Sequence, residues 1–61
     1  MHDYLVTRFT DRWLFWTVEG RFVQYRSEAS LLTKKEANKA KTDQQPYYSE
    51  PLEIRHHKNF N

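Results

Sequence analysis

Three short runs rich in aromatic and β-branched residues open the chain, and turn-forming residues separate them. The runs span residues 4–9, 12–18 and 21–25, with Thr10-Asp11 after the first and Glu19-Gly20 after the second. Runs of this composition are typical of β-strands. Because glycine reaches the positive φ that tight hairpins require, the pattern predicts a turn at Gly20, the one glycine of the chain. Residues 4–25 are therefore predicted to form a three-stranded antiparallel meander.

A signal for the start of a helix follows at Thr33. The sequence Thr33-Lys34-Lys35-Glu36 fits a capping box, in which the Thr33 hydroxyl accepts from the backbone of Glu36 and the Glu36 carboxylate accepts from the backbone of Thr33. We expect a helix over residues 33–42, with Ala37 and Ala40 on one face. These small side chains would let the helix lie close to a sheet.

The last segment alternates between apolar and charged residues. Residues 52–55 read Leu, Glu, Ile, Arg, which predicts a half-buried strand over 52–56. Pro51 has no amide hydrogen to donate, which favours an edge position for this strand. Residues 57–61 are expected to be a frayed tail. The prediction is thus one small α+β domain over residues 1–61, an antiparallel sheet of β-β-β-α-β topology with one helix packed on one face.

Length and composition favour binding over catalysis. A chain of 61 residues without cysteine buries little surface on folding and has no disulfides to stabilise it. It has no glycine-rich loop, no cysteine nucleophile and no serine with a patterned base, so we expect no catalytic residues, no cofactor and no enzyme activity. Only 38% of residues are apolar, yet 16% are aromatic, which is atypical of disordered chains. Burial against a partner, or self-association, would supply the extra stability.

The histidines do not predict a metal site, and the N-terminus does not predict a targeting segment. His56 and His57 are neighbours at the end of a predicted strand, where alternate side chains point to opposite faces, so with His2 they are not expected to bind a metal. The longest apolar run is four residues, 13–16, and Met1 is not followed by a basic and then a long apolar stretch. We therefore expect neither a signal peptide nor a membrane span, and a cytoplasmic location.

The longest strand is apolar on both faces. Alternation places Trp13 and Phe15 on one face and Leu14 and Trp16 on the other. Because one short helix covers one face only, the other is expected to present aromatic and arginine side chains, the types enriched at protein interfaces. The predicted partner-binding residues are Trp13, Phe15, Trp16, Phe22, Tyr25, Arg12 and Arg21.

Three alternatives stand beside this prediction. In one, the chain covers its own second face with residues 31–32, residues 47–48 and the tail, which would complete a thin core. In another, the aromatic and arginine residues bind nucleic acid, although the net charge is only +2, acidic residues lie among the arginines and no RNA-recognition motif occurs. In the third, both faces are consumed in a homodimer or larger homo-oligomer.

The order of segments offers one resemblance. An aromatic hairpin ends at Tyr25 and is followed by Ser27-Glu28-Ala29, Thr33-Lys34-Lys35-Glu36-Ala37 and a final Leu52-Glu53-Ile54. This arrangement is similar to that of many small orphan accessory proteins of bacteriophages, over most of the chain and without a diagnostic motif. The resemblance implies a protein made in the cytosol of an infected bacterium. It also implies inhibition or modulation of a larger host protein, an enzyme or a defence complex, by occluding its surface.

Overall fold

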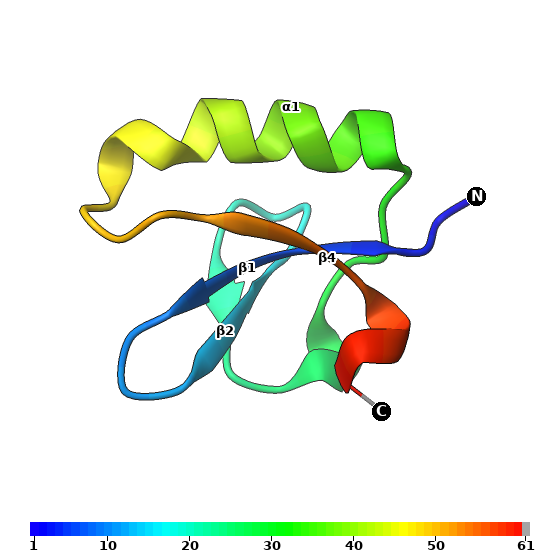
Figure 1. The fold of residues 1–61 in the computed structure, drawn as a ribbon, viewed down its shortest axis with the longest axis horizontal. Helices are drawn as coiled ribbons and strands as arrows, with labels where there is room; N and C mark the ends of the chain where they lie inside the picture. The colour runs from blue at the N-terminus through cyan, green and yellow to red at the C-terminus, as the bar shows by residue number, and fades with distance from the viewer. Residues whose placement is uncertain (61) are drawn as a thin grey trace.

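The computed structural model describes residues 1–60, apart from the side chain of Phe60, as a four-stranded antiparallel sheet crossed by one α-helix (Figure 1). The helix is α1 (Lys34–Gln44), and the strands are β1 (Tyr4–Phe9), β2 (Trp13–Trp16), β3 (Phe22–Val23) and β4 (Glu53–His56). Short 3-10 helices are η1 (Arg26–Glu28), η2 (Gln45–Tyr47) and η3 (His57–Phe60). The predicted small α+β fold is confirmed.

The strands lie in the order β3-β2-β1-β4, so β4 is an edge strand, as Pro51 indicated. Strand β2 is shorter than expected because the turn after it begins early. The amide of Gly20 donates to the Thr17 carbonyl at 2.9 Å, and the Thr17 amide donates to the carbonyl of Arg21 at 2.8 Å. Gly20 has a φ of 91°, which confirms the glycine turn.

Helix α1 begins where the capping box places it. The Glu36 amide donates to the Thr33 hydroxyl at 3.1 Å, and the Thr33 amide donates to the Glu36 carboxylate at 2.9 Å. The helix continues past its expected end at residue 42, to Gln44. An i, i+4 ion pair of 3.2 Å between Lys39 and Asp43 spans this last part of the helix.

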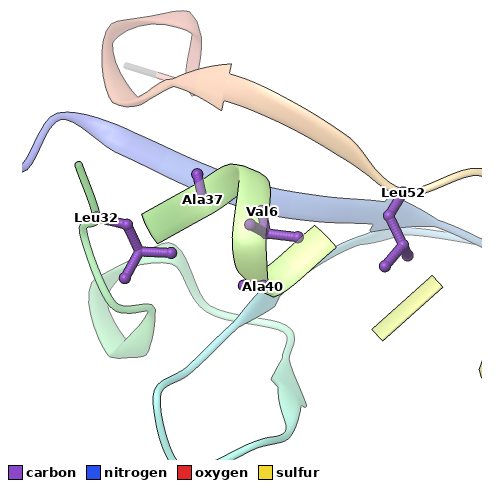
Figure 2. Close-up of a cluster of buried hydrophobic side chains, with 5 residues drawn as sticks. All are labelled: Val6, Leu32, Ala37, Ala40 and Leu52. Atoms are coloured by element: carbon purple, nitrogen blue, oxygen red, sulfur yellow. The ribbon is translucent and has the colours of Figure 1, made fainter. Parts of the chain in front are cut away.

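The core lies between α1 and the central strands. Figure 2 shows Ala37 and Ala40 of the helix close to Val6 of β1, with Leu32 and Leu52 on either side. Ala37 and Val6 have no exposed surface. Two alanines on the buried face bring the helix close to the sheet, as the sequence predicted.

The face of the sheet away from α1 is partly buried by the chain itself, so the prediction that this whole face is open is wrong. Leu5 is fully buried and Phe15 is 5% exposed, although both point away from the helix. Figure 1 shows η1 and η3 on this side of the sheet. The segment after η1 is held there because the Ser30 amide donates to the Trp16 carbonyl at 3.3 Å. The connection from β3 to α1 thus runs along the end of β2 before it reaches the helix.

The C-terminal residues are ordered as far as the structure describes them. Instead of a frayed tail, residues 57–60 form η3, and the His57 amide donates to the Asp3 carbonyl at 2.9 Å. This bond extends the β1–β4 pairing by one step, because Tyr4 lies opposite His56 in the ladder. Asn61, the last residue of the predicted tail, lies outside the described residues.

Candidate functional site

A groove runs between α1 and the end of β2, on the helix side of the sheet. Helix α1 packs over β1 and β4 and leaves the β2 side of this face less covered. The groove has a volume of about 210 Å³. Its apolar lining comes from Trp16, Val18, Leu32 and Ala40, and its polar lining from Glu36, Lys39, Asp43 and Gln44.

The apolar lining is continuous with the core. Trp16 is half-buried and packs against the buried cluster, while Leu32 and Ala40 belong to that cluster. The indole nitrogen of Trp16 is buried and has no hydrogen-bond partner among the described residues. Val18, by contrast, is 68% exposed and lies in the turn after β2, where its amide donates to the Ser30 hydroxyl at 2.9 Å. One wall of the groove therefore belongs to the core and another is open to solvent.

Charged side chains on α1 line the same groove. Lys39 is paired with Asp43, whereas the carboxylate of Glu36 lies 3.5 Å from the His2 imidazole. Hydrogen bonds from the backbone and then the hydroxyl of Thr33 lower the pKa of Glu36, which keeps this carboxylate ionised at neutral pH. The groove lining carries two carboxylates and one ammonium group, so its net charge is negative.

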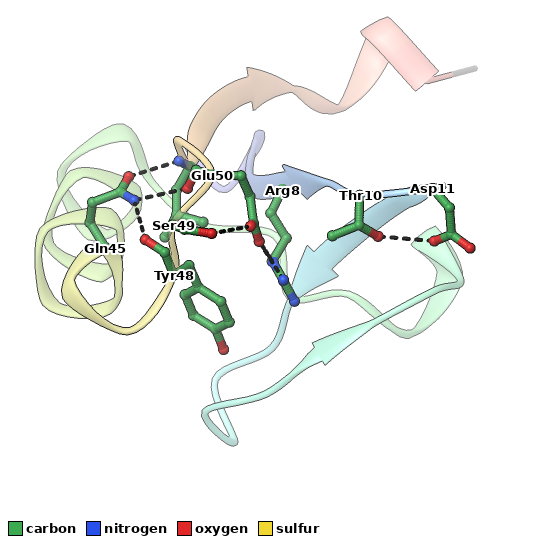
Figure 3. A network of polar contacts seen from close by, with 8 residues as sticks. Arg8, Thr10, Asp11, Gln45, Tyr48, Ser49 and Glu50 are labelled. Atoms are coloured by element: carbon green, nitrogen blue, oxygen red, sulfur yellow. Dashed lines mark hydrogen bonds and ion pairs between the residues drawn. The ribbon is translucent and has the colours of Figure 1, made fainter.

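The other end of the helix face is closed by a polar network (Figure 3). Arg8 forms an ion pair with Glu50, and its guanidinium carbon lies 4.3 Å from the centroid of the Tyr48 ring. The side chain of Gln45 accepts from the Leu52 amide at 2.7 Å and donates to the Glu50 carbonyl at 3.0 Å. These bonds fix the connection between α1 and β4 over the sheet.

The pKa of Glu50 lies below its usual value. A hydrogen bond from the backbone amide of Glu50 is the main cause, and the hydrogen bond from Arg8 adds to it. Arg8 and Glu50 are 42 positions apart, so no local pattern in the sequence pairs them.

The predicted aromatic site residues do not form one surface. Trp16 and Phe22 lie opposite each other in the β2–β3 pairing and pack against the core on the helix side. Trp13 and Phe15 point to the other side of the sheet. Phe15 is buried there, so the prediction that its side chain is exposed for a partner is wrong. Trp13 is half-buried, its ring centroid 5.0 Å from that of Phe9 in an edge-to-face contact and 5.0 Å from the guanidinium carbon of Arg55.

The remaining predicted residues are exposed but lie outside the groove. Arg12 donates to the Gln24 side chain at 2.6 Å and lies 3.7 Å from the Asp11 carboxylate, and Arg21 lies 3.2 Å from the Glu19 carboxylate. Tyr25 is 59% exposed. Pairing with neighbouring carboxylates offsets the positive charge of both arginines.

Sequence reasoning missed most of the groove. Of its lining residues, only Trp16 was predicted as a partner-binding residue. Val18 gave a usable signal, because it is an apolar residue next to a predicted turn. The groove residues on the helix gave no such signal, because polar residues on a helix normally indicate a face exposed to solvent.

Asp3, His56 and His57 form one cluster that has the side chains to hold a metal ion. One ligand atom from each lies within 4.8 Å of the others. The sequence argument against a metal assumed an extended chain at both histidines. Strand β4 ends at His56, however, and the two imidazoles stack at 4.8 Å with an interplanar angle of 26°. The geometric reason for excluding a metal here is therefore wrong.

Comparisons with protein-family models, with curated proteins and with solved structures give no match to this chain. Within residues 1–60, no helix has the length and apolar character needed to cross a membrane. The groove and its charges are therefore the basis on which a function is inferred.

Proposed function

We propose that this protein is a small, non-enzymatic binding protein that docks on a larger protein and takes one apolar side chain of that partner into the groove between α1 and β2. The observation that carries this proposal is an apolar groove built around a half-buried tryptophan. Its volume of about 210 Å³ is below the range of roughly 300–1,000 Å³ typical of small-molecule sites. A groove of this size suits a side chain better than a whole substrate.

The chemistry of the groove specifies the partner further. Burying one large aliphatic or aromatic side chain contributes about 1.5–3 kcal/mol, and tryptophan is among the residues enriched at the centres of interfaces. The carboxylates of Glu36 and Asp43 outnumber the ammonium of Lys39 around the groove. We therefore expect the partner to present a basic residue beside its apolar anchor.

The mode of action that we propose is occlusion. The groove is small and open to solvent, so the protein would act by covering a surface of its partner and would inhibit or modulate that partner without turnover. Resemblance to bacteriophage accessory proteins suggests a bacterial enzyme or defence complex as the target. This choice of target stays a prediction.

The variant Val18→Lys tests whether the partner docks in the groove. Val18 is 68% exposed, so Val18→Lys should change stability by less than about 0.5 kcal/mol while it places a charged chain at the groove. Tyr47 is 77% exposed and does not line the groove, so Tyr47→Lys is the matched control. Each protein is immobilised, partners are captured from bacterial lysate, and the affinity of the captured partner is measured for all three.

We expect Val18→Lys to weaken binding by about tenfold or more and Tyr47→Lys to leave it nearly unchanged. A partner that binds Val18→Lys with wild-type affinity would show that the groove is not the docking site. A wild-type chain that retains no saturable partner would contradict the binding function itself.

Nucleic-acid binding has less support from the geometry. Arg12 and Arg21 are both close to carboxylates, and Trp13 and Trp16 point to opposite faces, so stacking aromatics and free guanidinium groups do not share one surface. A nucleic-acid complex would lose affinity steeply between about 50 and 200 mM salt. Binding that is nearly flat over this range would exclude this alternative for the captured partner.

A further inference from the structure

We propose that Asp3, His56 and His57 form a zinc site where the residue before β1 pairs with the first residue of η3. All three residues are half-buried, and one ligand atom from each lies within 4.8 Å of the others. Two imidazoles and one carboxylate form a ligand set that zinc accepts. Water would occupy the fourth position of a tetrahedral ion held in this way.

Backbone pairing brings these ligands together. The β1–β4 ladder places Tyr4 opposite His56, and the next amide along, that of His57, donates to the Asp3 carbonyl. At His57 the chain leaves the strand and enters η3, which turns the His57 ring to lie against that of His56. Adjacent histidines are thus brought to one side of the chain, an arrangement that a continuous strand would not allow.

The spacing requires only small side-chain movements. His57 Nε2 lies 3.8 Å from Asp3 Oδ1. Ligands bound at 2.0–2.2 Å around a tetrahedral ion are about 3.4 Å apart, so this pair is already near the required separation. His56 Nδ1 accepts from the Lys58 amide at 3.2 Å, and this contact is exposed.

Zinc at this site would stabilise the fold by linking the residues before β1 to the start of η3. It would hold η3 in place on the face of the sheet away from α1. A small domain without cysteine gains stability from such a link, and an ion that binds the folded chain alone stabilises it increasingly as its concentration rises.

The test is thermal unfolding of the full-length, untagged chain at increasing Zn²⁺ concentration, with calorimetry for stoichiometry. Asp3→Asn removes the carboxylate at nearly constant shape, and His57→Gln removes one imidazole. His2→Ala is the matched control, because His2 is 66% exposed, lies 3.5 Å from Glu36 and is outside the cluster. Mg²⁺ controls for general ionic effects, since imidazole ligands do not suit it.

We expect one Zn²⁺ to bind per chain, and the unfolding midpoint of the wild-type chain and of His2→Ala to rise with Zn²⁺ but not with Mg²⁺. Asp3→Asn and His57→Gln should each bind Zn²⁺ at least about tenfold more weakly. The proposal is overturned if the wild-type midpoint does not respond to Zn²⁺, or if both cluster variants respond as the wild type does. It is also overturned if His2→Ala loses the response.

Discussion

Replacing Trp16 with alanine is predicted to destabilise the domain by more than replacing Trp13 with alanine. Trp16 packs against the buried cluster on the helix side, and truncating a core tryptophan typically costs about 3–5 kcal/mol. A stability of roughly 0.05–0.15 kcal/mol per residue gives about 3–9 kcal/mol for 61 residues. Trp13 lies outside that cluster, and its contacts with Phe9 and Arg55 are worth about 0.5–1.5 and 0.5–1 kcal/mol. Trp13→Ala is therefore expected to destabilise the domain less.

Urea unfolding followed by far-UV circular dichroism measures the difference. With a slope of about 1 kcal/mol per molar urea, a loss of 3 kcal/mol lowers the midpoint by about 3 M. Trp16→Ala should therefore lower the urea midpoint by about 3 M or more, while Trp13→Ala should lower it by less and keep a cooperative transition. A larger shift for Trp13→Ala than for Trp16→Ala would refute the assignment of Trp16 to the core. The same calculation explains why Trp16→Ala is a poor test of partner binding and why Val18→Lys is preferred.

Three further predictions concern local structure. Thr33→Ala removes the N-cap of α1 and should lower the free energy of unfolding by about 1 kcal/mol in urea melts, whereas no loss would contradict the capping box. Gly20→Ala places a Cβ at a φ of +91°, and since no described atom lies within 4 Å of it, the expected loss of about 1–2 kcal/mol is purely conformational. Hydrogen bonds lower the pKa of folded Glu36 from 4.5, so its ionised form stabilises the fold above about pH 4.5, and this contribution is lost as the pH falls through the folded-state pKa. Glu36→Gln should flatten the acid limb of the stability curve, and superimposable limbs would show that this carboxylate contributes nothing.

Features set by neighbouring residues were predictable from the sequence. Thr33 and Glu36 predict the start of α1 because the capping box involves only their own backbone and side-chain atoms. Gly20 predicts a turn because few other residues adopt a positive φ at a low conformational cost. The alternation of residues 52–55 and Pro51 likewise place β4 at the edge of the sheet. In each case, interactions within a few consecutive residues determine the local structure.

Features that depend on distant segments were not predictable in the same way. The segment between β3 and α1 has no sustained period, so its path along the sheet could not be predicted. Phe15 consequently looked exposed, although the folded chain buries it. The ion pair between Arg8 and Glu50 joins two segments that only the folded sheet brings together.

The candidate sites show the same division. Strand alternation correctly placed Trp13 and Trp16 on opposite faces of the sheet. The groove also depends on where α1 lies over the sheet, and the sequence does not specify that position. The geometric argument against a metal was wrong for a related reason. It assumed that His56 and His57 point to opposite faces of a strand, whereas the chain turns at His57 and brings its imidazole beside that of His56.

The most direct test of the groove uses the two indole N–H signals of the ¹⁵N-labelled protein as internal reporters. The captured partner is titrated into the protein and both signals are followed by NMR. Trp16 lines the groove, while Trp13 points to the other face of the sheet, so the account predicts a saturable shift of the Trp16 signal with little change at Trp13. A shift confined to Trp13 would place the partner on the opposite face and contradict docking in the groove.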